Sequence, residues 1–391
     1  MFRLSRLACC LLPAAMLAAT AAHAAEPFVF GMSISQTGGL APGARAVLLG
    51  MQIWVEDTNA EGGLLGRQVK LVTYDDQSNP ALVPGIVAKL LDVDKVDFLL
   101  GGQGTNLIAP LMPAAIQRNL TVIGMFGPLA EPFFEVAATM NPKPQTIALV
   151  GADAEFSRNA VDGARTVAKR AGLKIVYDNT YPPSTQDYTP IVRAIQATSP
   201  DLVFVGSYPT DTVGIIRAVN EVGLNAKMFG GAMVGSQLGS LKAQMGPMLN
   251  GLVNYDFWLP VGAYATPEAK AFIAKYQARV GNSGADTLGY YQPPYAYADL
   301  QVIGQAIRET GGTDQAKLAE YLRSHTFHTL VGDIKFGPNG EWTEPRVLEV
   351  QFHDVKGHDL DQFRSMDTQT VLYPPALKTG TVRYPFSELR Q

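Results

Sequence analysis

Residues 57–80 read DTNAEGGLLGRQVKLVTYDDQSNP and join a helix to a strand and that strand to a second helix. The first helix is predicted by side chains that recur at helical spacing, which are Val47, Met51, Trp54 and Thr58. Gly62 and Gly63 end this helix, and the apolar run from Val69 to Asp75 predicts a strand. Asn79-Pro80 then predicts a helix start, because the asparagine can cap free N–H groups and the proline lacks one.

The same alternation continues along the chain. Eight apolar runs predict strands: Phe28 to Ser35, Val69 to Asp75, Val96 to Gly101, Thr121 to Met125, Thr146 to Gly151, Lys174 to Asn179, Leu202 to Ser207 and Leu252 to Phe257. Amphipathic runs between them predict helices, so we expect an α/β fold with mostly parallel sheets covered on both faces. Thr189-Pro190 and Thr266-Pro267 predict helix starts, and Gly172 and Gly223 predict helix ends.

The predicted strands form two series, the first ending near Phe126 and the second near Phe257, followed by two helices and a hairpin-like tail. The chain of 391 residues is also longer than the ~250–300 residues at which single cores usually split. Right-handed crossovers make each series a doubly wound lobe, and such sheets bind ligands beyond the carboxyl ends of their strands. We therefore expect the binding site in the cleft between two lobes.

The amino-terminal residues have the pattern of a cleavable secretory signal. Arg3 and Arg6 precede an apolar run from Leu7 to Ala19, and Ala22-His23-Ala24 offers a cleavage site. We predict a signal peptide at residues 1–24 and an exported, periplasmic mature chain. Cys9 and Cys10, the two cysteines, lie inside that signal, so no disulfide or thiolate site is expected in the mature protein.

Composition and motifs argue against several classes of function. The formal net charge is −4, and no run of Lys and Arg suggests a nucleic-acid partner. The histidine pairs His325 and His328, and His353 and His358, have no third ligand nearby, so no metal site is expected. No Gly-x-Ser-x-Gly motif or marked pair of acids predicts catalysis. We expect no cofactor and no enzymatic activity.

Two glycine-containing loops follow predicted strands. Residues 34–40 contain Ser35 and Thr37, whose hydroxyls could hold a polar ligand, although a flexible turn explains the glycines equally well. Residues 101–106 read GGQGTN, and Thr105 or Asn106 could bind a ligand or simply cap the next helix.

Aromatic side chains gather at the predicted strand ends. They are Phe126, Tyr208, Phe257 and Trp258, together with Phe156 at a helix start and the YYQPPYAY stretch from Tyr290 to Tyr297. Such residues more often close a core, but flat apolar ligands are bound by the same side chains.

The chain resembles the leucine/isoleucine/valine-binding receptors, the branched-chain amino acid and amide branch of the type I periplasmic binding proteins. The resemblance covers nearly the whole mature chain. It is carried by residues 57–80, AIQATSPDLVFVG at 194–206, NEVGLNAKMFGG at 220–231, AYADL at 296–300 and IKFGPNGEW at 334–342. It implies a monomeric, hinged receptor of an ABC importer whose partners are permease and ATPase subunits. It also implies three lobe crossings, with lobe 1 at 25–127 plus 259–330 and lobe 2 at 128–258 plus 331–391.

The resemblance further implies a set of ligand-binding positions. They fall on Thr37, on Gln103, Thr105 and Asn106, on Phe126 and Gly127, on Phe156, on Ser207 and Tyr208, and on Ala232 or Met233. The last position holds the acidic partner of a ligand ammonium in the family, and here it is apolar.

This sequence departs from the family pattern in three ways. No hydroxyl near Phe126 and Gly127 is available for a ligand carboxylate, and the acid is replaced by Ala232 and Met233. The first crossing after Gly127 is compressed before a predicted helix at Pro132 to Thr139. Because an unpaired buried ammonium is costly, we expect an aromatic or flat carboxylate, an amide or a urea-like ligand. Two alternatives stay open: a branched-chain amino acid receptor that uses another acid such as Asp256, and an extracytoplasmic sensor subunit.

Overall fold

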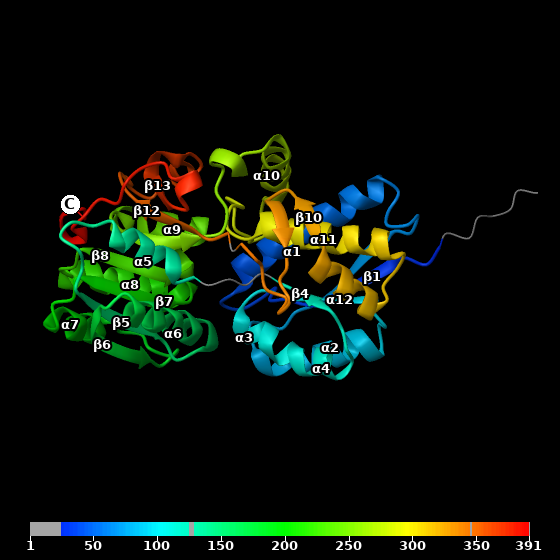
Figure 1. Ribbon diagram of the computed structural model, residues 1–391, viewed down its shortest axis with the longest axis horizontal. Helices are drawn as coiled ribbons and strands as arrows, with labels where there is room; N and C mark the ends of the chain where they lie inside the picture. Colours follow the sequence, from blue (N-terminus) through cyan, green and yellow to red (C-terminus); the bar gives the residue numbers. More distant parts are fainter. Residues whose placement is uncertain (1–24, 125–128, 345, 391) are drawn as a thin grey trace, which may run out of the picture.

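A computed structural model describes residues 25–124, 129–344 and 346–390. The predicted signal peptide at 1–24 and the predicted ligand positions Phe126 and Gly127 lie outside these residues. Within them no helix combines the length and the apolar character needed to cross a membrane. The described strands form two large sheets and one small hairpin, and Figure 1 shows the two large sheets with their helices side by side.

The first sheet is built from the amino-terminal part of the chain. Its strands are β1 (Phe28–Ser33), β2 (Val69–Tyr74), β3 (Phe98–Leu100) and β4 (Val122–Ile123), in the order β2-β1-β3-β4 and all parallel. The helices that follow these strands are α1 (Ala41–Ala60), α2 (Val83–Asp92), α3 (Thr105–Ile108) and α4 (Met112–Gln117). Two helices from later in the chain, α11 (Pro293–Thr310) and α12 (Gln315–Ser324), lie with this group, and α11 packs along α1 (Figure 1).

The second sheet has seven strands in the order β13-β12-β9-β8-β7-β5-β6. The parallel strands are β5 (Thr146–Ala152), β6 (Lys174–Tyr181), β7 (Leu202–Ser207), β8 (Met228–Met233) and β9 (Val253–Asp256). At one edge β12 (Leu348–Phe352) and β13 (Gln369–Tyr373) are added antiparallel. The associated helices are α5 (Glu131–Ala138), α6 (Glu155–Arg170), α7 (Thr189–Ala197), α8 (Pro209–Val222) and α9 (Gly239–Met245).

The two sheets, built mostly of parallel strands with helices between them, confirm the predicted α/β class. The helical face predicted on α1, from Val47 to Thr58, is buried as expected. Gly62 and Gly63 follow the helix with positive φ angles, and a Cβ on Gly63 would lie 2.0 Å from the Arg67 carbonyl oxygen. The glycine end of this helix is therefore required by a close backbone approach.

Helix ends were predicted with mixed success. The side chain of Thr266 caps α10 (Pro267–Val280) by accepting from the Ala269 N–H, and Gly223 ends α8 in the left-handed conformation. Asn79 caps only a short 3-10 turn at Pro80–Leu82. The helix start predicted at Thr189-Pro190 is confirmed, because α7 begins at Thr189. Thr189 is not its cap: its side chain makes no capping hydrogen bond, and its N–H donates to the Asp187 carboxylate at 2.9 Å.

One central strand, β8, is not predicted by the sequence pattern. Its sequence MFGGAM contains two adjacent glycines, which normally weaken a strand. Here they are needed: a Cβ on Gly230 would lie 1.5 Å from the Val253 carbonyl oxygen, and a Cβ on Gly231 would lie 2.7 Å from the Phe204 ring. The glycines allow β8 to fit tightly between its neighbours in the sheet.

The small hairpin of β10 (Thr326–Thr329) and β11 (Gly332–Lys335) packs on α11 and α12. The predicted lobe boundary at residue 330 falls between these two strands. The lobe boundaries and the three crossings stay predictions, and part of the first crossing lies outside the described residues.

Candidate functional site

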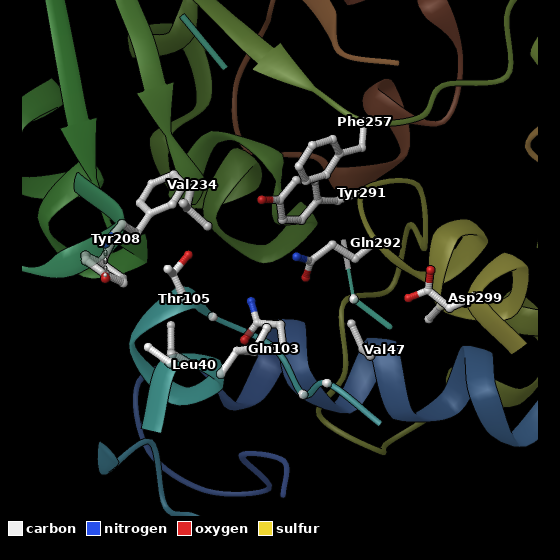
Figure 2. A pocket seen from close by; sticks show the side chains of 18 of the residues that line it. Leu40, Val47, Gln103, Thr105, Tyr208, Val234, Phe257, Tyr291, Gln292 and Asp299 are labelled. Atoms are coloured by element: carbon white, nitrogen blue, oxygen red, sulfur yellow. Dashed lines mark hydrogen bonds between the residues drawn. The ribbon is translucent and has the colours of Figure 1, made fainter. Parts of the chain in front are cut away.

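A cavity of about 380 Å³ lies beyond the carboxyl ends of the parallel strands and is lined from both groups of elements (Figure 2). From the first group come the loop after β3, the helix α1 and the start of α11. From the second group come Phe156, Tyr208, Val234 and Phe257, each at or next to a strand end or helix start. This is the position predicted for a ligand cleft in two facing sheets.

The loop after β3 passes very close to neighbouring backbone. A Cβ on Gly101 would lie 2.8 Å from the Ile123 carbonyl oxygen, and a Cβ on Gly102 would lie 2.3 Å from that of Ser33. Gly104 has a φ of 96°. These glycines are therefore fixed by geometry, and they hold Gln103 and Thr105 at the cavity.

Two amide side chains face the cavity from the first group. Gln103 comes from the loop after β3, and Gln292 directly precedes α11. Their Oε1 atoms are buried and have no hydrogen-bond partner. Gly43 on α1 leaves room for both, since a Cβ there would lie 3.3 Å from the Gln103 Nε2 and 3.8 Å from the Gln292 Oε1. Figure 2 shows both amides turned toward the cavity, so they can offer hydrogen bonds to a ligand.

A stack of aromatic rings forms one wall. The rings of Phe257 and Tyr291 are nearly parallel, at 6°, with centroids 5.2 Å apart. The phenol groups of Tyr255 and Tyr291, which both line the cavity, share a hydrogen bond of 2.7 Å. The wall is rigid and mostly apolar, and it suits a flat ligand surface.

A second aromatic pair stands at the opposite end. Phe156 and Tyr208 pack edge to face with centroids 5.7 Å apart, and the Phe156 N–H donates to the Tyr208 phenol oxygen at 3.2 Å. Leu40 and Tyr208 also line a second cavity of about 770 Å³ on their other side. The two side chains thus separate the inner cavity from an outer groove.

Asp299 is the one acidic side chain among the described residues that line the inner cavity, and no described Lys, Arg or His lines it. It lies on α11, is 6% exposed and accepts no hydrogen bond from any described residue. Burial raises the pKa of Asp299 to about 7. Figure 2 shows it on the far side of Val47 and Gln292 from Tyr208.

Four of the predicted ligand positions therefore meet at this cavity: Gln103, Thr105, Phe156 and Tyr208. Asn106 lines the outer groove instead, and its buried Oδ1 has no hydrogen-bond partner. No side chain caps α3, so neither Thr105 nor Asn106 has the capping role that was the alternative interpretation. Their ligand-binding role stays a prediction.

Thr37 lies apart from the inner cavity. It is exposed, and its hydroxyl donates to the Asp75 carboxylate at 2.7 Å. Hydrogen bonds from Thr37, Gln77 and Gln36 outweigh desolvation and lower the pKa of Asp75. In the structure Thr37 therefore braces the loop between β1 and α1.

Met233 is also turned away from the cavity. Its side chain is fully buried in the core, and the next residue, Val234, lines the cavity in its place. Because β7 and β8 pair in register up to Ser207 and Met233, the residues after them, Tyr208 and Val234, are the ones that reach the cavity. Asp256, the acid of the amino-acid alternative, is 1% exposed and does not line the cavity.

Sequence reasoning missed Gln292 and Asp299 as cavity residues. They lie with Ala296 at positions i, i+4 and i+7, so they share one face at the start of α11. A carboxylate on an otherwise apolar helix face was the available signal, and the aromatic stretch from Tyr290 to Tyr297 leads into the same helix.

Comparison with known proteins gives the same picture of the fold. The family described as periplasmic binding protein matches residues 27–136 and 126–345. The chain is 24% identical over 342 residues to the leucine-, isoleucine-, valine-, threonine-, and alanine-binding protein of Pseudomonas aeruginosa, which covers 81% of this chain and 88% of that protein.

Two solved structures are also similar. A leucine binding protein from Thermotoga maritima has a TM-score of 0.71 at 20% identity, over 83% of this chain and 95% of that one. A solute binding protein of an ABC transporter from Rhodopseudomonas palustris, in complex with 3,4-dihydroxy benzoic acid, has a TM-score of 0.70 at 18% identity, over 85% of this chain and 94% of that one. At these identities the likeness shows the fold, and the named ligands belong to those proteins.

Proposed function

Because the chain belongs to the periplasmic binding protein family, we propose that it is the solute-binding receptor of an ABC importer for an aromatic or otherwise flat carboxylate, amide or urea-like compound. The family is one of binding proteins, so the chain is not an enzyme, and the predicted resemblance to leucine/isoleucine/valine-binding proteins is confirmed. The proposed partners are the ligand and the permease and ATPase subunits of the importer, with the receptor as a periplasmic monomer.

The side chains that line the inner cavity are the main support for the proposed class of ligand. Stacked rings of Phe257 and Tyr291 stand on one side, and Phe156 with Tyr208 stands at one end. Rings in such arrangements cover the faces of a flat ligand and exclude water from it. A cavity of about 380 Å³ is at the small end of ligand pockets, which suits a single ring or a short amide.

Neutral polar groups supply the rest of the proposed contacts. The amides of Gln103 and Gln292 and the hydroxyl of Thr105 can hydrogen-bond a ligand carboxylate or carbonyl. A cationic side chain is not among the described lining residues, so the ligand's anionic end would be held by hydrogen bonds alone.

A branched-chain amino acid receptor is the second candidate. It is favoured by the names of the relatives and by Asp299, a cavity carboxyl that could pair with a ligand ammonium. Against it, the apolar Val234 faces the cavity at the strand end where the family's acid was expected. The ammonium group of an amino-acid ligand would therefore have to be bound by Asp299 on α11, in the first group of elements.

A thermal-shift panel separates the two candidates. Ligand at 100 times its dissociation constant adds about 2.7 kcal/mol of stability, which is a shift of several degrees. We expect shifts with benzoate-like acids, short amides or urea, and none with leucine, isoleucine or valine. Shifts with the three amino acids alone would replace the proposal with the amino-acid receptor.

A further inference from the structure

We infer that Asp299 selects the ligand: the cavity takes a flat molecule that presents a hydrogen-bond donor, such as a hydroxyl, amide or amine hydrogen, to this carboxyl. The inference rests on the proposed function and narrows its ligand class to compounds with a donor at the end remote from their acid or carbonyl group.

The other buried aspartates of the described chain have donors within the protein. Asp76 accepts from the Ser33 and Ser35 hydroxyls, Asp211 from the Tyr181 phenol at 2.5 Å, and Asp286 from the Gly239 and Gly289 N–H groups. Asp299 is just as buried, at 6% exposed, and accepts from no described residue. Its oxygens are not among the fully enclosed atoms, so they are open to the cavity that Asp299 lines. A carboxyl largely removed from water is costly without a hydrogen-bond donor, so its place beside the cavity points to a donor that arrives with the ligand.

No described residue donates a hydrogen bond to Asp299, the Gln292 amide on the same helix face included. Val47 and Met51 on α1 and Ala296 on α11, which line the same cavity, are apolar. A hydrogen bond to a carboxylate in such surroundings is strong, because little water competes for it.

Charge fixes the direction in which the ligand lies. A ligand carboxylate beside Asp299 would repel it, so the anionic end belongs near Gln103 and Thr105 and the donor end near Asp299. Figure 2 shows Asp299 beyond Val47 and Gln292 and away from Thr105, as this orientation requires.

The test uses matched ligands in which the hydroxyl hydrogen is present, is replaced by a methyl group, or is absent together with its oxygen. Dissociation constants of benzoate and of the 3- and 4-hydroxybenzoates and 3- and 4-methoxybenzoates are measured by calorimetry on the full mature protein. Asp299→Asn keeps the shape of the side chain without its charge, and Asp299→Leu removes both acceptors. Glu309→Gln is the matched control, because it removes one charge from an exposed position of the same helix.

We expect one hydroxybenzoate to bind at least about tenfold more tightly than its methoxy counterpart and than benzoate. The preference should fall to about threefold or less in Asp299→Asn, vanish in Asp299→Leu and persist in Glu309→Gln. If Asp299→Leu does not fold, the Asp299→Asn comparison decides.

Two failures are distinguishable. If the benzoates bind but donor and methoxy forms bind alike, or the preference survives in Asp299→Asn and Asp299→Leu, the inference is wrong and the proposed function stands. If no benzoate or amide binds any variant while leucine binds the wild type, both are wrong.

Discussion

The carboxyl of Asp299 should make the ligand-free protein sensitive to pH. Burial raises its pKa from 3.8 to about 7, so the folded state holds this proton more tightly than the unfolded state. The Asp299 carboxyl therefore contributes favourably to the stability of the folded state below about pH 4, and this contribution is lost as the pH rises toward 7.

We predict that Asp299→Asn flattens the pH dependence of thermal unfolding. Relative to wild type, the melting temperature of the variant should rise progressively between pH 4 and pH 8, with the largest gain at pH 8. Thermal unfolding of both proteins without ligand, with Glu309→Gln as control, measures this. Parallel curves for wild type and Asp299→Asn would show that the carboxyl is solvated or paired.

Phe156 and Tyr208 should matter more for binding than for folding. Both are half-buried and face the cavity, whereas Phe204 is fully buried in the core. We predict that Phe156→Ala and Tyr208→Ala each weaken ligand binding by tenfold or more and cost less stability than Phe204→Ala, for which about 3–5 kcal/mol is usual. Chemical denaturation and calorimetry give both quantities. Normal binding by either folded variant would remove that residue from the site.

At the residue scale the sequence predicted cavity positions better than it predicted their chemistry. Gln103, Thr105, Phe156 and Tyr208 follow strands or begin helices, where parallel sheets bind ligands, and the family resemblance implied them as ligand positions. Asp299 was missed because it lies inside a helix whose face otherwise has the pattern of a core. Thr37 was singled out by its loop, but its partner Asp75 comes from the next strand end, a contact that only the fold reveals.

At the scale of elements, the loop after β3 carries Gln103 and Thr105, two of the side chains proposed to bind the ligand. Gly102→Ala would place a Cβ 2.3 Å from the Ser33 carbonyl oxygen, so the loop that carries Gln103 must move. We predict a stability loss of about 1–3 kcal/mol and a clear loss of ligand affinity.

The matched control for this variant is Gly85→Ala on α2, where a Cβ meets no atom within 4 Å. It should leave affinity unchanged and stability equal or slightly higher, since alanine favours a helix. Equal affinity of Gly102→Ala and wild type would mean that the loop does not hold the ligand.

Secondary-structure propensity did not predict a strand whose conformation depends on close packing with its neighbours. The glycines of β8 oppose a strand prediction, but each is required by a neighbour, Gly230 by the Val253 backbone and Gly231 by the Phe204 ring. Such approaches between segments distant in sequence cannot be found from local pattern. The strands rich in Val, Ile and Leu, such as β5 and β7, were predicted nearly to the residue because they are buried on both faces.

At the scale of the whole molecule, the lining of the cavity by two groups of elements predicts closure around the ligand. Phe156 and Tyr208 come from the second group and Gln103 and Asp299 from the first, so a ligand that contacts both draws them together. Small-angle scattering should give a smaller radius of gyration with saturating ligand than without. Identical curves would contradict hinge closure, and Phe156→Ala at the same ligand concentration provides the control.

The overall architecture was predictable because the alternation of strand and helix patterns is regular over most of the chain. The α/β class and the cavity at the strand ends follow from that alternation and are found in the structure. The predicted first crossing near Gly127 was argued from chain length between elements, and it concerns residues outside the described ranges.

The central claim, that this receptor carries one flat carboxylate, amide or urea-like molecule in the cavity, is tested most directly by native mass spectrometry of the mature protein purified from its own cells. We predict a monomer with a single bound molecule that is released on unfolding and identified as an aromatic or flat acid, amide or urea-like compound with a hydrogen-bond donor. Release of leucine, isoleucine or valine as the bound molecule would contradict the account.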